Sequence, residues 1–409
     1  MKKTIAFLLL LILILQSIPL MTIGATVKGT KPDFEDVIPV IAAIDTKMNL
    51  NSPSAVLMEG STGQILFEKN KDEKLKPASI TKIMTLLLIY EALEADQLRL
   101  MDDVTVSEHA ASMGGSQVYL EPYEVQNVET MIKCISIASA NDASVAMAEH
   151  IAGSEEEFVA RMNEKAKELG MMNTNFVNCC GLDADNHYST AYDVALMSRE
   201  LITRFPEVSN YTTIWMDTFV HTTKKGRSEF GLTNTNKLIK SYKGITGLKT
   251  GSTSIAKYCL SATARRNNMD LIAVILAAPD TKTRFAEAAK LLNYGFANYS
   301  VFVDDNKDIV IEPVAVAKGV SEYAYGQVKD EFSYLCSSGR KPENIRKEIV
   351  LYDKVVAPLT TEDKIGDIIY YYENDKIGSV DILASEAIKK AGYFDCLKKS
   401  LKKYFVAYN

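Results

Sequence analysis

Apolar residues in this chain follow helical spacing in some segments and strand-like runs in others. Short apolar runs at 55–59 and 64–67, separated by Gly60-Ser61-Thr62-Gly63, predict a β-hairpin. Segment 80–93 lacks Gly and Pro and is apolar on nearly every side, which predicts a buried helix. Further segments follow the same two patterns: helical spacing at 128–152, 155–169 and 281–299, and strand-like runs at 258–264 and 271–277. These elements together predict an α+β fold.

The pattern changes beyond Tyr299. Residues 301–380 contain short β-branched and aromatic runs, such as 309–316 and 368–372, between Gly, Asp and Asn turns. Such spacing is typical of a small all-β domain. The chain has 409 residues, enough for two domains. We therefore expect one domain over 26–302 and a β-rich domain over 303–392.

The N-terminus has the pattern of an export signal. Lys2 and Lys3 precede an apolar run at 5–15, and Ile23-Gly24-Ala25 offers a cleavage site with a small last residue. We expect a signal peptide over 1–25; an uncleaved membrane anchor is the alternative. Either places the bulk of the chain outside the membrane.

The C-terminal segment 393–409 is amphipathic. Its apolar positions recur every three or four residues, with lysines on the opposite side: Phe394, Leu397, Leu401, Phe405 and Tyr408 against Lys398, Lys399, Lys402 and Lys403. This pattern suits a helix lying on a membrane surface and also an ordinary surface helix. Its position after a complete domain favours the membrane.

Composition limits the chemistry further. The formal net charge of −6 gives no general electrostatic reason to bind nucleic acid. The four histidines show no paired metal-ligand spacing, so we expect no metal or other cofactor. Six cysteines in a chain of this length do not resemble a small disulfide scaffold, and a bond between adjacent Cys179 and Cys180 would be strained. We expect mostly free thiols.

Three short strings assemble the parts of a serine acyl-transfer site. They are Ser79-Ile-Thr-Lys82, Ser139-Ala-Asn141 and Lys249-Thr-Gly251, in that order. Ser-x-x-Lys alone occurs four times and carries little weight, whereas Ser-x-Asn and Lys-Thr-Gly each occur once. A serine hydroxyl needs a nearby base, and Lys82, one helical turn from Ser79, supplies it if its amine is uncharged. Burial and a second cation, Lys249, both favour the uncharged amine.

The other residues of the strings have matching roles. Ser139 would relay a proton to the leaving amine, and Asn141 would hold Lys82 and the substrate amide. Lys249 and Thr250 on a strand edge, with Gly251 permitting close approach, suit a substrate carboxylate. Backbone N–H groups of Ser79 and Ser252 would form the oxyanion hole. Taken singly, such strings are commonly a surface pair, a helix cap or an exposed strand end.

With these residues in place, the chain resembles the low-molecular-mass penicillin-binding serine D-Ala-D-Ala carboxypeptidases over roughly residues 35–409. Further residues carry the likeness: Asn141-Asp-Ala-Ser144, Leu169-Gly170-Met171, Gly181-Leu182, His187-Tyr-Ser-Thr-Ala191 and Asn234-Thr-Asn236. The resemblance implies a penicillin-binding or β-lactamase-like catalytic domain, with an antiparallel sheet flanked by helices, and then a small all-β domain.

The resemblance also implies roles for individual residues. Ser79 is then the acylated nucleophile, Lys82 its base, and the strings at Ser139 and Lys249 the second and third motifs. Arg284 matches a family arginine that helps to hold the terminal carboxylate. Two positions depart from the family pattern, which has an acidic residue at Thr246 and His or an aromatic residue at Ser252. We expect these departures to alter substrate preference or rate.

The expected function is removal of the terminal D-alanine from peptidoglycan stem pentapeptides through an acyl-enzyme, with covalent acylation by β-lactams such as the penicillins. The expected location is the outer face of a bacterial cytoplasmic membrane or the cell wall. A β-lactamase is one alternative, but segment 173–193 lacks the glutamate that such enzymes use to activate water. A catalytically silent penicillin-fold module that binds peptidoglycan or a wall-building partner is the other.

Overall fold

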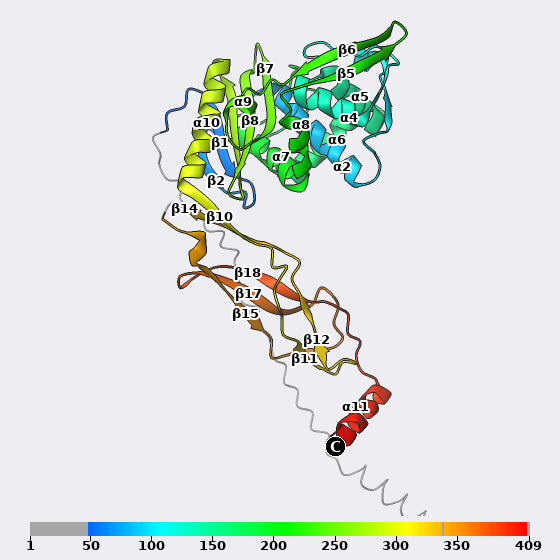
Figure 1. Ribbon diagram of the computed structural model, residues 1–409, viewed down its shortest axis with the longest axis vertical. Coiled ribbons are helices and arrows are strands. Elements are labelled where there is room, and N and C mark those ends of the chain that lie inside the picture. Colours follow the sequence, from blue (N-terminus) through cyan, green and yellow to red (C-terminus); the bar gives the residue numbers. More distant parts are fainter. Residues whose placement is uncertain (1–47, 338, 407–409) are drawn as a thin grey trace, which may run out of the picture. The chain divides into compact units, whose positions relative to one another are not determined.

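The computed structural model describes residues 48–337 and 339–406 (Figure 1). The predicted signal peptide lies outside the described residues. The expected α+β fold is confirmed, with a helix-and-sheet catalytic domain followed by an all-β domain.

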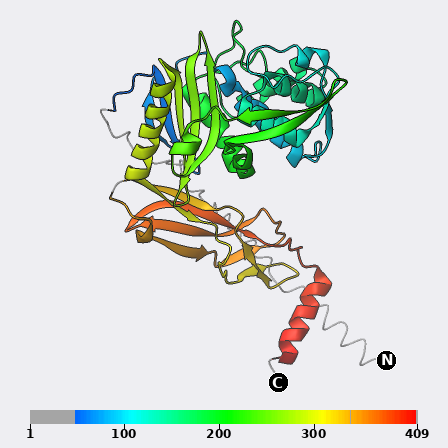
Figure 2. The same cartoon turned by 45° about the horizontal axis from the view of Figure 1, so that its top comes forward.

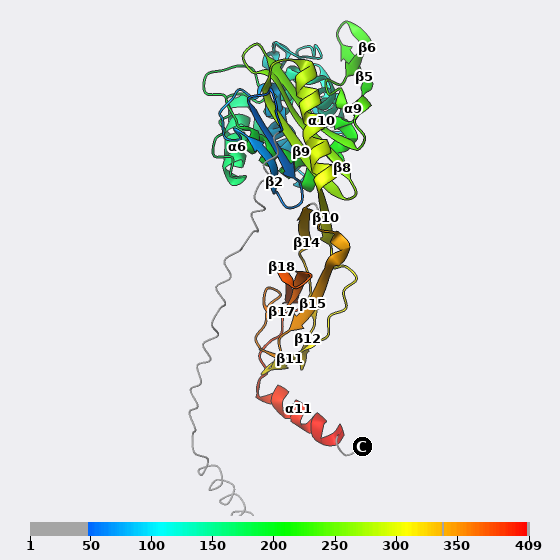
Figure 3. The ribbon, with the colours of Figure 1, turned by 90° about the vertical axis from the view of Figure 1, so that its left-hand side faces the viewer.

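A five-stranded antiparallel sheet forms half of the catalytic domain. Its order is β2-β1-β9-β8-β7, so that β7 is an edge strand. The strands are β1 (Ser54–Glu59), β2 (Ile65–Lys69), β7 (Ile245–Thr253), β8 (Lys257–Arg266) and β9 (Met269–Ala278). Helix α10 (Thr281–Asn298) packs on β8 and β9, and α7 (Ala191–Arg204) packs on β1 and β9 (Figure 3).

The other half of the domain is helical (Figure 2). Helix α2 (Lys82–Glu94) is buried along most of its length, as its apolar pattern predicts, and packs against α5, α6 and α7. The other elements are β3 (Asp103–Thr105), α3 (Glu108–Ala111), β4 (Val125–Asn127), α4 (Val128–Lys133), a π-helical turn (Cys134–Ala138), α5 (Asn141–Ala152), α6 (Glu155–Glu168), α8 (Ser209–Thr212) and α9 (Leu238–Ser241).

The predicted helix at 128–152 is broken in two. Its first part ends in the π-helical turn, after which Ser139 adopts the left-handed conformation with φ of 63°. Helix α5 then begins at Asn141. The break presents Ser139 and Asn141 together at the end of a helix, where a continuous helix would turn them to different sides.

A long hairpin that the sequence did not reveal joins the two halves. It consists of β5 (Met216–Thr223) and β6 (Gly226–Thr233), paired along their full length. Strand β6 packs against the π-helical turn that precedes Ser139. The hairpin therefore borders the segment that carries the second motif.

The C-terminal domain consists of short strands, as its sequence pattern predicts. They are β10 (Tyr299–Asp304), β11 (Val314–Ala317), β12 (Tyr323–Ala324), β13 (Gly326–Gln327), β14 (Phe332–Ser337), β15 (Ile345–Leu351), β16 (Lys354–Val356), β17 (Lys364–Tyr372) and β18 (Asp375–Ala384). Its core includes the stacked rings of Phe332 and Tyr370, whose centroids are 3.8 Å apart.

Helix α11 (Tyr393–Val406) follows the β domain. Its large apolar side chains are exposed: Tyr393, Phe394, Leu397, Leu401 and Tyr404. Within residues 48–406, no helix is long and apolar enough to cross a membrane. Tyr408 lies outside the described residues.

Candidate active site

Ser79 and Lys82 meet at the start of α2. Ser79 lies in a 3₁₀ turn, Ala78–Thr81, that leads directly into the helix, and Lys82 is the first residue of α2. The Lys82 Nζ lies 3.1 Å from the Ser79 Oγ. The predicted pair is therefore within hydrogen-bonding distance.

The surroundings of Lys82 determine how its amine is used. Its side chain is fully buried, and burial lowers its pKa. Nζ lies 2.6 Å from the Asn141 Oδ1 and 2.6 Å from the carbonyl oxygen of Cys180. An uncharged amine has two N–H donors and one lone pair, and these two oxygens only accept. They therefore take both N–H groups and leave the lone pair for the Ser79 hydroxyl.

Asn141 is itself held on both sides of its amide. Its Nδ2 donates to the Gly114 carbonyl at 2.7 Å, which identifies Oδ1 as the atom facing Lys82. Its backbone N–H donates to the Ser116 carbonyl at 2.7 Å. The loop containing Gly114 and Ser116 thus fixes the orientation of Asn141.

Ser139 and Lys249 form the second polar contact of the site. The Lys249 Nζ donates to the Ser139 Oγ at 2.8 Å and to the Thr250 carbonyl at 3.1 Å. Burial, together with the neighbouring cations Lys82 and Arg284, moves the pKa of Lys249 well below its usual value.

Gly251 lets the edge strand β7 pass directly beside the nucleophile. A Cβ at this position would lie 2.8 Å from the Pro77 carbonyl oxygen and 3.0 Å from the Ser79 nitrogen. The next residue, Ser252, has an exposed side chain. The preceding residue, Thr250, has its Oγ1 2.5 Å from the Oγ1 of Thr235, a site contact that the sequence did not predict.

Arg284 reaches β7 from the first turn of α10. It is 6% exposed, and one terminal nitrogen donates to the carbonyls of Gly251 at 3.0 Å and Cys259 at 3.2 Å. Its Nε has no hydrogen-bond partner. Burial lowers the pKa of Arg284.

These contacts leave the buried basic side chains of Lys82, Lys249 and Arg284 without a carboxylate partner in the described structure. The acceptors of Lys82, Lys249 and Arg284 in the described structure are hydroxyl, amide and carbonyl oxygens. Buried charges are normally paired with opposite charges. The site is therefore suited to a ligand that carries a carboxylate.

The loop between α6 and α7 supplies the Cys180 carbonyl, and sequence reasoning missed this role. Asn178 Oδ1 shapes the loop by accepting from the N–H groups of Gly181 at 2.7 Å and Leu182 at 3.1 Å. Gly181 has φ of 88°, and a Cβ there would lie 1.9 Å from the Ala78 carbonyl oxygen. The string Gly181-Leu182 was the only sequence signal for this loop. The role of the Cys180 carbonyl could not be predicted, because every residue type has a backbone carbonyl.

His187 ties the same loop to α2. Burial lowers its pKa to about 4, so the imidazole is neutral at physiological pH. Its Nδ1 accepts from the Val177 N–H at 3.0 Å, so Nε2 carries the proton and donates to the Thr81 Oγ1 at 2.8 Å. This histidine has a structural role next to Ser79 and Lys82.

Thr246, one of the departures from the expected pattern, is used within the sheet. Its Oγ1 donates to the Thr263 Oγ1 at 2.9 Å, and its carbonyl accepts from the Thr212 hydroxyl at 2.8 Å. The threonine therefore joins β7 to β8 and to α8, and it is not among the hydrogen-bond partners of the catalytic lysines in the described structure.

Comparisons with known proteins agree with this geometry. Residues 41–280 match the family described as D-alanyl-D-alanine carboxypeptidase, and residues 300–390 match the penicillin-binding protein 5 C-terminal domain. D-alanyl-D-alanine carboxypeptidase DacF of Bacillus subtilis is 44% identical over 348 residues, covering 85% of this chain and 88% of that protein. DacA of Escherichia coli is 30% identical, with 91% of each chain covered.

A solved structure shows the same arrangement. Penicillin binding protein 5 from Haemophilus influenzae superimposes with a TM-score of 0.70 at 30% identity, covering 84% of this chain and 99% of that one. The likeness therefore extends over both domains.

Proposed function

Because the chain belongs to the D-alanyl-D-alanine carboxypeptidase family and has that family's serine carboxypeptidase function, we propose how its residues divide the reaction. The substrate is a peptidoglycan stem peptide that ends in D-Ala-D-Ala. Ser79 becomes acylated by the penultimate residue, the terminal D-alanine leaves, and water then releases the shortened peptide. The arrangement around Lys82 carries this proposal.

The first step is attack by Ser79 on the scissile carbonyl carbon. As the Oγ–C bond forms, the hydroxyl proton passes to the lone pair of Lys82, whose two N–H groups are already held by Asn141 and Cys180. The negative charge that develops on the carbonyl oxygen is stabilised by the N–H groups of Ser79 and Ser252.

The second step breaks the C–N bond. Ser139, held by Lys249 at 2.8 Å, passes its hydroxyl proton to the leaving nitrogen. It regains a proton from the Lys82 ammonium, which restores the neutral amine. In deacylation a water molecule takes the place of the departed amine, and the same groups remove its proton.

The terminal carboxylate is held by the third motif and by Arg284. Thr250 offers a hydroxyl, and Lys249 and Arg284 offer the positive charge that no protein carboxylate neutralises in the described structure. A bound carboxylate favours the ammonium form of Lys249. A charged Lys249 in turn favours the neutral form of Lys82, because like charges in a buried site repel each other.

A defined pentapeptide and a fluorescent penicillin test this proposal together. Mass spectrometry should show the loss of one alanine from the pentapeptide, and the penicillin should label the wild type but not Ser79→Ala. A joined peptide dimer would show transpeptidation instead. A folded wild type that stays unlabelled would leave only a binding module.

The same proposal includes a location. The segment 1–25 has an export pattern, and α11 exposes a row of large apolar side chains beside Lys398, as a helix in a membrane interface does. Relatives of this family act on peptidoglycan outside the cytoplasm. We place the enzyme at the outer face of a bacterial cytoplasmic membrane, attached through α11.

A further inference from the structure

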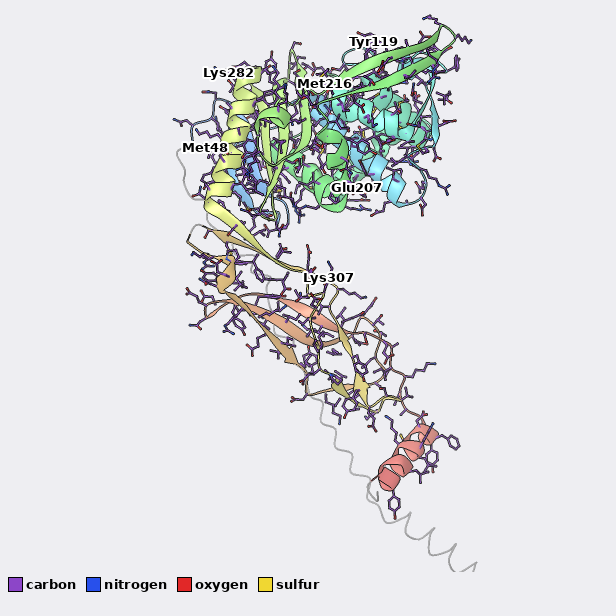
Figure 4. The ribbon with its side chains drawn as sticks, viewed as in Figure 1. Met48, Tyr119, Glu207, Met216, Lys282 and Lys307 are labelled. Atoms are coloured by element: carbon purple, nitrogen blue, oxygen red, sulfur yellow. The ribbon has the colours of Figure 1, made fainter. Side chains whose placement is uncertain are left out.

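An aromatic contact that the reaction steps above do not use lies between the loop before β4 and the β5–β6 hairpin. The rings of Tyr119 and Phe230, here called the aromatic bridge, meet edge-to-face with centroids 6.0 Å apart. Figure 4 shows Tyr119 beside the β5–β6 hairpin. Tyr119 is 64% exposed although it lies between two buried residues, Val118 and Leu120.

The backbone of Tyr119 is held in an unfavourable conformation. Its φ is 61°, in the left-handed region that a bulky residue adopts only when its surroundings enforce it. The enforcing group is the buried carboxylate of Asp142, which accepts from the N–H groups of Val118 and Leu120, both at 3.1 Å. Asp142 directly follows Asn141, so the catalytic segment itself fixes the direction of Tyr119.

The loop that carries Tyr119 begins at the catalytic amide. Three residues before Tyr119, the Ser116 carbonyl accepts from the N–H of Asn141 at 2.7 Å. One end of the aromatic bridge is thus anchored beside the groups that hold Lys82.

The other end of the aromatic bridge is anchored beside the third motif. Strand β6 carries Phe230 and continues to Thr235, whose hydroxyl lies 2.5 Å from that of Thr250. Between these ends, Ser139 meets Lys249 at 2.8 Å. Strand β6 also packs against the π-helical turn that directly precedes Ser139. The aromatic bridge therefore joins two segments that both border Ser139.

A buried hydrogen bond keeps the loop and the hairpin together. His221 of β5 contacts the Phe230 ring, with centroids 5.5 Å apart, and its Nδ1 lies 2.9 Å from the Glu124 Oε1. Glu124 is on the loop that carries Tyr119, and Gln126 also donates to it at 2.8 Å. The aromatic bridge is thus held in place from both the loop and the hairpin.

We propose that the aromatic bridge is the wall of the groove on the leaving-group side and that it limits which groups the enzyme accepts there. The proposal rests on the role of Ser139 as proton donor to the leaving nitrogen, because the strand that carries Phe230 packs against the turn directly before that residue. Two fixed rings provide an apolar surface that suits a small group such as the methyl of D-alanine and excludes bulky substituents.

Two pairs of β-lactams probe the two sides of the groove separately. The first pair is two cephalosporins with the same acyl side chain, one with a methyl group and one with a bulky aromatic group at C3, on the leaving-group side. The second pair is two penicillins that differ only in the acyl side chain. The measured quantity is the second-order rate constant for acylation by each compound.

Tyr119→Ala should raise the rate ratio of the bulky to the small cephalosporin about tenfold and leave the penicillin ratio within about twofold. Phe230→Ala should act in the same direction. Tyr123→Ala is the matched control, because Tyr123 lies in the same loop, is also 64% exposed and also has a positive φ, of 67°, but its hydroxyl donates to Glu108 of α3. It should change neither ratio.

Either of two results would overturn the assignment. An unchanged cephalosporin ratio in a Tyr119→Ala protein that is still acylated would show that the bridge does not face the leaving group. A change confined to the penicillin ratio would place the bridge on the acyl side. Failure of the wild type to be acylated by any of the four compounds would instead contradict the proposed function.

Discussion

The catalytic domain and the C-terminal β domain each contain a cluster of buried or half-buried polar groups, and the two clusters are completed differently. In the β domain, the Lys347 Nζ lies 2.6 Å from an Asp304 oxygen, and the Tyr370 hydroxyl donates to Asn306 at 2.9 Å. Each charge there has its opposite. In the catalytic domain, Lys82, Lys249 and Arg284 bond only to neutral oxygens within the described structure.

This difference separates a structural cluster from a functional one. A cation that is paired with a carboxylate of the protein stabilises the fold and has little remaining affinity for an anionic ligand. Buried basic groups such as Lys249 and Arg284, when they are charged and have only neutral acceptors, are unfavourable for folding and favourable for binding an anion. The arrangement of partners, more than the presence of polar residues, therefore distinguishes the two regions.

The largest expected effect comes from removing one lysine in each cluster. Lys82→Ala should slow acylation by penicillin by about 10²–10⁴-fold, because it removes the general base. Lys347→Ala should leave the acylation rate within about twofold and cost about 1 kcal/mol of stability or less, because its ion pair is partly exposed. Stopped-flow acylation and thermal unfolding measure the two effects. Equal losses of acylation in both variants would contradict the distinction between a structural cluster in the β domain and a functional cluster in the catalytic domain.

Two glycines sharpen the same comparison at a smaller scale. Gly251→Ala should slow acylation about 10–100-fold. The new methyl group would press on the backbone at Ser79 and shift the nucleophile, and such overpacking costs about 1–3 kcal/mol. In the β domain, a Cβ at Gly378 would lie 2.5 Å from a ring carbon of Phe332. Gly378→Ala should therefore lower the stability of that domain and leave acylation intact. Loss of acylation on the Gly378 change would contradict this division.

The membrane contact should depend on α11 and on no part of the catalytic site. Phe394→Ser with Leu397→Ser should weaken vesicle binding at least about tenfold, since each side chain contributes about 1.5–3 kcal/mol when buried in the interface. Hydrolysis of a soluble pentapeptide should be unchanged. Cosedimentation with vesicles measures the first quantity. Undiminished binding would show that α11 is an ordinary surface helix.

The smallest effect is expected at Thr246. Thr246→Asp restores the acidic residue that the family pattern has, but it also breaks the 2.9 Å hydrogen bond to Thr263. We expect the ratio of hydrolysis rates between two stem peptides to change about two- to threefold. The loss of the hydrogen bond should lower the free energy of unfolding by less than about 1 kcal/mol. A change of a hundredfold would show that position 246 contacts the substrate directly.

The sequence predicted the chemical groups of the site better than their arrangement. The three strings and Arg284 all lie together, since side-chain chemistry can be read from residue types. The buried helix, the hairpin at the start and the strands beside the third motif also followed from their apolar patterns. The family resemblance, the fold class and the carboxypeptidase function are confirmed.

The groups that hold the site in place could not be predicted in the same way. The carbonyls of Cys180, Gly114 and Ser116 are backbone atoms, which every residue has, so no pattern distinguishes them. The break before Asn141 depends on one left-handed residue, Ser139, that is not glycine. The strands of the β5–β6 hairpin are largely exposed, so their apolar pattern was too weak to predict the hairpin.

The pH dependence of acylation tests the central claim most directly. If Lys82 acts as a neutral base, the acylation rate should fall at low pH as Lys82 becomes protonated. Because burial lowers the pKa of this amine from the ordinary 10.5, the midpoint of the fall should lie below that value. A rate constant for penicillin acylation that becomes level at a pH clearly below 10.5 would support the account. A rate that keeps rising with pH until about the ordinary lysine value would contradict it.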